Sequence, residues 1–148
     1  MARGGPDGFR IVDLRAVCTG GKYHSVDSSE MSFKMAGSRA LREAIERVGV
    51  EVLEPVSTID VPVPAAYHGD VLGDLNSRRA QVLGTDTDEA GVTTVQALVP
   101  TAEILRYAID LRSLSGGSGS FEVDHHGYQP LPENLAARVR ADAEASQQ

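Results

Sequence analysis

The sequence is short of the features that mark several large classes of protein. Its 148 residues include no tryptophan, three phenylalanines and one cysteine, Cys18. A lone cysteine cannot form an internal disulfide, which fits a reducing compartment. No apolar run approaches the roughly 20 residues that span a bilayer, and residues 1–10 lack the apolar stretch of a signal peptide. We therefore expect a cytoplasmic protein with no membrane partner.

Positive charge is also scarce, and it is unevenly distributed. The formal net charge is −7. Residues 1–49 carry eight Lys and Arg against six Asp and Glu, whereas residues 50–148 carry six against fifteen. Proteins that bind nucleic acid through general electrostatics usually have basic surfaces. We therefore expect any contact with phosphate to come from the first third of the chain.

The glycine-rich stretches do not match a nucleotide site. Gly21-Lys22 is followed by Tyr23 and has no glycine five residues earlier, so it departs from G-x-x-x-x-G-K-[ST]. Residues 115–120 (SGGSGS) contain no lysine and are typical of a flexible turn into a strand. We expect no cofactor in this chain.

Two polar clusters resemble catalytic or metal sites in composition only. His24, Ser25 and Asp27 are close neighbours on one loop, and no G-x-S-x-G elbow is present. His125 and His126 are adjacent on an expected strand, where successive side chains point to opposite faces, and no HExxH motif accompanies them. We expect no catalytic residue and no metal. A small hydrolase that uses His24 or His126 is the alternative that mutation of either residue would test.

The first third of the chain predicts one strand and one long helix. Residues 9–18 alternate in part between apolar and polar side chains, which indicates a strand with one buried face. Asp27 and Glu30 have the spacing of a capping box for a helix over about residues 28–48, and Gly49 is placed to end it. A stripe at three- and four-residue steps predicts that one helix face meets a core: Phe33, Gly37, Ala40, Leu41, Ala44 and Val48.

The remainder predicts a β-α-β-β-α-β order. Alternation, helical spacing and turn residues place strands at 56–64, 81–86, 92–100 and 119–126, and helices at 65–79 and 101–114, the second opened by Thr101. The prolines of the first strand favour an edge position or the end of the strand. This order is the split βαβ of a ferredoxin-like sandwich, so the fold class is α+β. The tail from residue 133 is expected to form a short helix or to be disordered.

A polar turn lies between the first strand and the long helix. It contains Lys22, Tyr23, His24 and Ser25. Aromatic rings and imidazoles stack on bases, and lysine neutralises phosphate, so this turn is the candidate RNA contact. An ordinary solvated connection is the alternative. The same two interpretations apply to the arginines farther along: Arg78 and Arg79 fit a helix C-terminus, and Arg112 fits a salt-bridge partner.

Three long motifs resemble the C-terminal part of bacterial elongation factor G. Residues 21–45 (GKYHSVDSSEMSFKMAGSRALREAI, from Gly21) resemble the end of the family's fourth domain. Residues 53–55 (LEP) and 69–79 (GDVLGDLNSRR) resemble the start and first helix of its fifth domain, and residues 97–121 (ALVPTAEILRYAIDLRSLSGGSGSF) resemble the second helix and its exit. The resemblance runs from about residue 8 to residue 132.

The resemblance implies both a fold and a role. Residues 1–52 would form the C-terminal portion of a domain like domain 2 of ribosomal protein S5, residues 53–132 a ferredoxin-like domain, and residues 133–148 a tail. The turn at residues 22–25 would be the tip that enters the decoding site of the ribosome and holds the tRNA–mRNA duplex during translocation, with His24 at the family's tip histidine. The implied ribosome-binding residues are Lys22, Tyr23, His24, Ser25, Arg78, Arg79 and Arg112.

Departures from the family pattern limit what the resemblance implies. The family's GTPase domain, which binds GTP and Mg, has no counterpart in this sequence, so this chain is not expected to be an enzyme. Arg106 replaces a glycine, Ala80-Gln81 replace Gly-Arg, and Ser118 replaces an arginine, which favours an elongation-factor-G-like paralogue. The alternative function is a free-standing ferredoxin-like module that binds a ligand or forms a homodimer through a hydrophobic outer sheet face.

Overall fold

The structure is a computed structural model that describes Gly5 and residues 8–145. The chain separates into two compact units. Unit 1 contains Met1–Glu51 and Pro132–Gln148, and unit 2 contains Val52–Leu131. Among the described residues, no helix combines the length and the apolar character that a membrane span requires.

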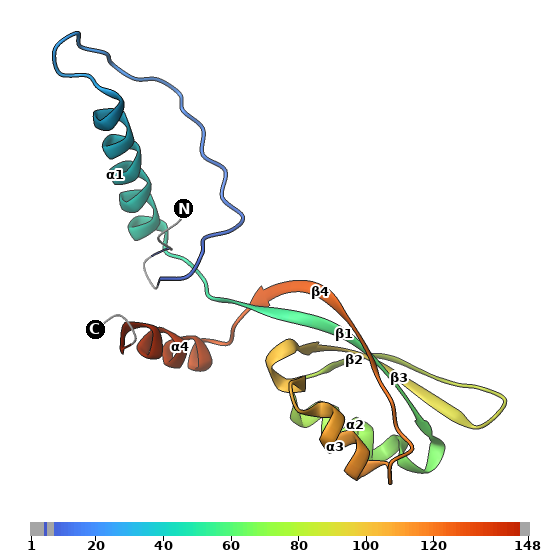
Figure 1. Cartoon of the computed structure of the whole chain (residues 1–148). Coiled ribbons are helices and arrows are strands. Elements are labelled where there is room, and N and C mark those ends of the chain that lie inside the picture. The colour runs from blue at the N-terminus through green and yellow to red at the C-terminus, as the bar shows by residue number, and fades with distance from the viewer. Residues whose placement is uncertain (1–4, 6–7, 146–148) are drawn as a thin grey trace. The chain divides into compact units, whose positions relative to one another are not determined.

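Unit 2 is a four-stranded sheet with two helices on one face (Figure 1). The strands are β1 (Leu53–Pro64), β2 (Gln81–Thr87), β3 (Val92–Pro100) and β4 (Glu122–Pro130), in the order β2-β3-β1-β4 with every pair antiparallel. The helices are α2 (His68–Ser77), which follows a 3₁₀ turn at Ala65–Tyr67, and α3 (Tyr107–Leu114), which follows one at Thr101–Ile104. The predicted β-α-β-β-α-β order and α+β class are confirmed.

The core of unit 2 lies between the sheet and the two helices. Alternate residues of β1 and β3 point toward the helices because successive side chains of a strand face opposite ways. Ile59 is paired with Ala97 and Val61 with Val95. The fully or almost fully buried apolar residues are Ile59, Val61, Val63, Val71, Leu75, Val95, Ala97, Val99, Tyr107 and Leu111. Burying one large apolar side chain of this kind stabilises a fold by about 1.5–3 kcal/mol, so this layer is the main source of stability in unit 2.

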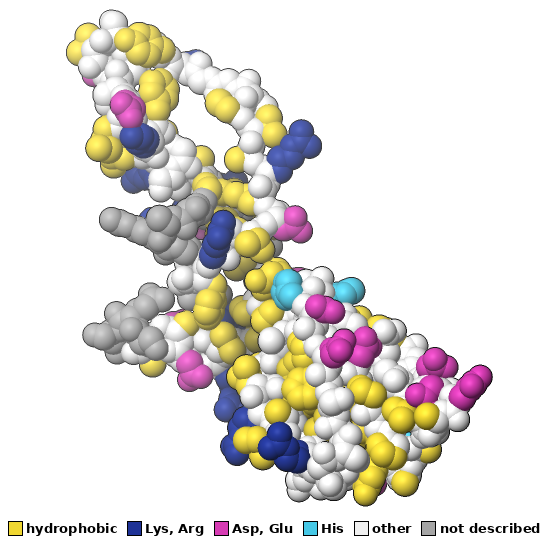
Figure 2. All heavy atoms as spheres, turned by 45° about the vertical axis from the view of Figure 1, so that its right-hand side comes forward, with side chains coloured by type: hydrophobic (Ala, Val, Ile, Leu, Met, Phe, Trp, Pro, Cys, Tyr) yellow, Lys and Arg dark blue, Asp and Glu magenta, His cyan; other side chains and the backbone are white. Residues whose placement is uncertain are grey.

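The opposite face of the sheet carries a group of polar side chains. Asp60 of β1 is paired with Gln96 of β3 on one side and Glu122 of β4 on the other, and Gln96 donates a hydrogen bond to Asp60 at 2.9 Å. Asp124 is paired with Thr58 on the same face. Figure 2 shows Asp and Glu side chains gathered on part of the surface of unit 2. Leu98 of β3 is also paired with Thr58, so this face carries an apolar side chain beside the polar ones. Self-association through the sheet stays a prediction.

The prolines of β1 lie where the strand has one neighbour only. Strand β1 is paired with β4 over residues 53–60 and with β3 over residues 56–64. Pro55 falls before the β3 pairing begins, and Pro62 and Pro64 fall after the β4 pairing ends. A proline offers no N–H to a ladder. Strand β1 thus has a neighbour on both sides over residues 56–60. The prediction that the prolines mark the end of the strand holds for Pro62 and Pro64.

The predicted helix over residues 101–114 is broken in two. A 3₁₀ turn covers Thr101–Ile104, and α3 begins only at Tyr107. The hydroxyl of Thr101 lies 2.8 Å from the hydroxyl of Ser57 on β1, and Arg106 rather than Thr101 precedes α3. The prediction that Thr101 opens this helix is therefore wrong, because a tertiary partner takes its hydroxyl.

Unit 1 contains the helices α1 (Glu30–Val48) and α4 (Glu133–Ala145). The prediction of a strand over residues 9–18 is wrong: this segment is extended but has no ladder (Figure 1). A strand needs a neighbour for its N–H and C=O groups, and no described segment supplies one. No residue of α1 is buried, and within the predicted apolar stripe Leu41 is half-buried while the other members are exposed. In the tail, α4 is formed through Ala145 and buries Ala136.

Candidate nucleic-acid interface

The candidate contact turn is joined to α1 by a cap that differs from the predicted one. Ser29 is the N-cap of α1, and its hydroxyl accepts a hydrogen bond from the backbone N–H of Ser32 at 3.1 Å. The prediction that Asp27 caps the helix is wrong. Asp27, Ser28 and Ser29 are all good capping residues, so the sequence alone did not decide which of them would take the position.

The turn closes on itself through His24 and Ser28. The backbone N–H of His24 donates to the hydroxyl of Ser28 at 2.8 Å, and the N–H of Ser28 donates to the carbonyl of His24 at 3.0 Å. A third bond joins the turn to the helix, because the hydroxyl of Ser32 donates to the carbonyl of Asp27 at 3.3 Å. These bonds give the turn a fixed shape at the N-terminus of α1.

The side chains of the turn are directed into solvent. Lys22, Tyr23, His24 and Ser25 are all exposed, with Tyr23 at 73%. The Nδ1 atom of His24 is 3.4 Å from a carboxylate oxygen of Asp27, and these two side chains are 68% and 81% exposed. Ser25 has no hydrogen bond to either of them among the described residues. The pair therefore lacks the nucleophile contact that a triad requires.

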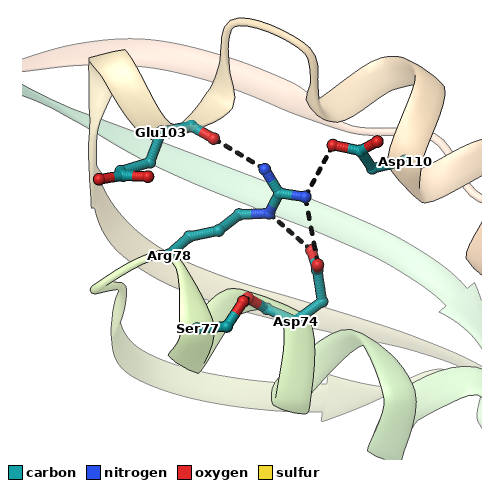
Figure 3. Close-up of polar contacts among 5 residues, drawn as sticks. All are labelled: Asp74, Ser77, Arg78, Glu103 and Asp110. Atoms are coloured by element: carbon teal, nitrogen blue, oxygen red, sulfur yellow. Dashed lines mark hydrogen bonds and ion pairs between the residues drawn. The ribbon is translucent and has the colours of Figure 1, made fainter.

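Arg78, in contrast, is occupied within unit 2 (Figure 3). Its Nε and Nη2 atoms donate to the two carboxylate oxygens of Asp74 at 2.8 and 3.1 Å, Nη1 donates to the carbonyl of Glu103 at 2.8 Å, and Nη2 also donates to Asp110 at 2.8 Å. Its guanidinium carbon lies 5.0 Å from the ring centre of Tyr107. The side chain is only 16% exposed. Its hydrogen bonds join the C-terminal end of α2 to the 3₁₀ turn at Thr101–Ile104 and to α3.

Arg79 makes a second set of internal bonds. Its two terminal nitrogens donate to the carboxylate of Glu54 at 2.8 and 2.9 Å, and Nε donates to Glu103 at 3.0 Å. Glu54 also accepts from Gln129 of β4 at 3.3 Å. The hydrogen bond from Arg79 lowers the pKa of Glu54, and burial opposes this effect. Arg79 has a φ of 60°, a conformation that places its side chain at the cost of some backbone strain.

Arg112 remains open to solvent on the last turn of α3. No ion pair joins it to another described residue. Two exposed apolar residues of the same region, Leu105 at 80% and Ile109 at 63%, lie near it in sequence. The structure therefore brings Lys22, Tyr23, His24 and Ser25 together on one turn, but it gives Arg78 and Arg79 internal partners. Their role as RNA contacts stays a prediction.

The carboxylates that bind Arg78 and Arg79 were not predicted from the sequence. Asp74 and Arg78 have the four-residue spacing of a helical ion pair, which was a readable signal. Glu54, Glu103 and Asp110 lie 25, 24 and 32 residues from the arginine that each contacts. Nothing local in the sequence marks these long-range pairs.

The described residues contain no group of three His, Cys, Asp or Glu side chains that could hold a metal ion. His125 contacts Tyr128 edge to face, with ring centres 5.5 Å apart. The β1–β4 register passes from Ser57–His125 to Val56–Gly127, so His126 is the extra residue of a bulge. A bulge changes the simple alternation of side chains that the sequence argument assumed.

Comparison with known proteins matches this chain to two family models. Residues 1–49 match the family model of elongation factor G, domain IV, and residues 51–139 match that of the elongation factor G C-terminus. The chain belongs to the elongation factor G family.

Individual relatives agree with this assignment. Proteins described as "Elongation factor G-like protein" from two strains of Mycobacterium tuberculosis, CDC 1551 / Oshkosh and H37Rv, are each 50% identical over 143 residues. Those matches cover 97% of this chain and 20% of each relative, so the chain spans about a fifth of their length. A crystal structure of a protein from Thermus thermophilus aligns with a TM-score of 0.86 and 34% identity, over 99% of this chain and 22% of that one.

Proposed function

We propose that this chain is the ribosome-contacting part of an elongation-factor-G-like translation factor. The turn of Lys22, Tyr23, His24 and Ser25 would enter the decoding site of the small subunit and hold the tRNA–mRNA duplex as it moves. The contact is mechanical, and no bond is made or broken by these residues. Hydrolysis of GTP would belong to a GTPase domain, which neither of the two matched domains is.

One observation carries the proposal: the turn is exposed, yet it is fixed by hydrogen bonds to the start of α1. The closing bonds between His24 and Ser28 and the cap at Ser29 keep the turn in one shape before any partner arrives. A group that is already ordered loses less entropy when it binds. Tyr23 and His24 offer faces for stacking, and Lys22 offers charge to phosphate.

The test compares two exposed histidines of the same protein. His24→Ala, built into a full-length factor that carries these residues, should slow translocation strongly while leaving GTP hydrolysis on the ribosome in place. His126→Ala removes another exposed imidazole, from the sheet of unit 2, and should leave translocation unchanged. An unaltered translocation rate in the His24→Ala factor would remove the tip assignment.

A second measurement addresses the lysine. Lys22→Ala should weaken binding of the chain to ribosomes and reduce the slope of log affinity against log salt by about one counterion. Arg106→Ala serves as the comparison in unit 2, because Arg106 has an exposed side chain and is not one of the predicted ribosome contacts. A slope that is the same in wild type and the Lys22→Ala chain would show that Lys22 does not meet phosphate.

A further inference from the structure

The histidine of the turn is held by the two residues that close the turn around it. We infer that Asp27 and Ser28 are positioning residues for His24, and that they leave Nε2 as the ring atom offered to RNA. This inference rests on the proposed function for the identity of the partner. The orientation of the ring, however, is a property of this chain that can be measured without a ribosome.

The backbone of the turn closes around Ser28. Ser28 is half-buried, whereas residues 21–27 are exposed. Its hydroxyl accepts the N–H of His24 at 2.8 Å, and its own N–H returns to the carbonyl of His24 at 3.0 Å. This pair of bonds makes one closed turn, on which the side chains of His24 and Asp27 approach each other. Ser28 therefore brings His24 and Asp27 face to face.

The imidazole ring of His24 lies beside the carboxylate of Asp27. The Nδ1 atom of His24 lies 3.4 Å from the Oδ2 atom of Asp27. A carboxylate only accepts hydrogen bonds, so the contact favours a proton on Nδ1. In the neutral ring Nε2 then carries no proton and is an acceptor. Asp27 is available for this contact because Ser29 caps α1 in its place, and its carbonyl is tied to the helix by Ser32 at 3.3 Å.

The arrangement selects the RNA groups that His24 can bind. A bare Nε2 accepts a hydrogen bond from a ribose 2′-hydroxyl or from a base amino group, both of which are donors. It accepts none from a phosphate oxygen, which has no proton to give. Lys22, two residues away, has three donors and no acceptor. The turn thus divides its contacts: Lys22 meets the backbone charge, and His24 meets a hydroxyl or amino group.

The direct test is NMR of the 148-residue chain, correlating ring nitrogens with carbon-bound ring protons under mildly alkaline conditions, with His24→Gln used to assign the signal. In wild type, His24 should be mainly the form protonated at Nδ1. Asp27→Ala should shift it toward the form protonated at Nε2. Glu30→Ala is the matched control, because it removes a nearby carboxylate that is paired with Lys34 rather than with the ring. The same tautomer in wild type and the Asp27→Ala chain would overturn the inference.

Ribosome binding by the same chain gives the second readout. Asp27→Ala and Ser28→Ala should each weaken binding about threefold, the size expected for loss of one exposed polar contact. Ser28→Thr keeps the hydroxyl and should restore binding, and Ser38→Ala removes an exposed hydroxyl of α1 outside the turn as the control. If His24→Ala weakens binding but Asp27→Ala and Ser28→Ala do not, the positioning role is wrong and the proposed function stands. If His24→Ala has no effect, the proposed function fails, and the tautomer measurement still decides the positioning role.

Discussion

Residues 8–51 expose the kinds of side chain that residues 52–131 bury. Phe9, Val12 and Phe33 are 46%, 52% and 49% exposed, whereas Ile59 and Leu75 are fully buried. Both regions carry apolar patterns in the sequence. The difference shows that a pattern specifies which face of an element can be covered, while burial itself depends on a second surface. Unit 2 supplies that surface from its own sheet and helices.

The two regions are also held by different bonds. The turn before α1 is fixed by short-range hydroxyl and backbone bonds that span three to five residues. Unit 2 is crossed by guanidinium bonds that span 24 to 32 residues. Local bonds can order a turn without a core, whereas long-range bonds need the whole unit to be folded. A substitution in the turn of unit 1 should therefore change the local structure only. A substitution at the long-range bonds of unit 2 should change the stability of the whole unit.

The largest expected effect is a truncation in the core of unit 2. Leu75→Ala should lower the free energy of unfolding of unit 2 by about 2–5 kcal/mol, because it removes a fully buried side chain and leaves a cavity. Met35→Ala, on the 61% exposed side chain of α1, should change it by less than about 0.5 kcal/mol. Urea unfolding followed by circular dichroism measures both. Equal losses for the two variants would contradict the contrast between the regions.

A smaller loss is expected from the arginine that joins α2 to α3. Arg78→Ala leaves Asp74, 18% exposed, without its ionic partner, and should cost about 2–3 kcal/mol in the unfolding of unit 2. The partly exposed Asp110 can regain water and limits the loss. Arg112→Ala, on the same pair of helices but open to solvent, is the matched control and should be near neutral. Thermal unfolding of the two variants side by side makes the comparison. A near-neutral Arg78→Ala would leave that arginine free for an RNA contact.

The smallest effect belongs to the hydroxyl of Tyr107, which is buried and has no hydrogen-bond partner among the described residues. Tyr107→Phe should be neutral or stabilising by up to about 1 kcal/mol at neutral pH, because it removes an unpaired polar group. Burial, with the charge of Asp74, raises the pKa of Tyr107 from 10.0 to about 12. As the pH rises, Tyr107 therefore loses its proton in the unfolded chain before it does so in the folded chain. The difference in proton binding favours the unfolded chain, so the stability that Tyr107 gives in its neutral form is fully present below pH 10 and is lost as the pH rises toward 12.

Stability measured from about pH 9 to pH 12 checks this last expectation. Wild type should lose stability across that window more steeply than the Tyr107→Phe chain, since the variant has no proton to release at this position. Tyr128→Phe, on a 66% exposed side chain of β4, is the control for tyrosine ionisation in general. Identical profiles for wild type and Tyr107→Phe would show that the hydroxyl is hydrated in solution.

Much of unit 2 could be predicted from the sequence because its elements alternate or repeat with clear periods. Strands β1 and β3 carry about one buried residue in two, and the hairpin between β2 and β3 is marked by turn residues. The break before Tyr107 could not be predicted, because helical spacing continues through it and the hydroxyl of Thr101 is taken by Ser57 from another strand. Tertiary partners decide such cases, and sequence spacing does not contain them.

The residues of the candidate site could be predicted from the sequence, but the contacts among them could not. Lys22, Tyr23, His24 and Ser25 are consecutive, so any turn would keep them together. The pairing of His24 with Asp27 depended on Ser29, rather than Asp27, becoming the cap. The expected strand over residues 9–18 failed for another reason: alternation describes two faces but does not supply the neighbouring strand that a ladder requires.

The placement of the three prolines in β1 has a consequence for how unit 2 behaves at high concentration. At each end of this strand one flank has no partner strand, and such flanks are where chains join edge to edge into aggregates. Pro55 lies at one of these flanks, and Pro62 and Pro64 at the other. A residue without an amide hydrogen is a poor template for an incoming strand. The prolines of β1 thus limit strand pairing within unit 2 and also disfavour the addition of a strand from another molecule.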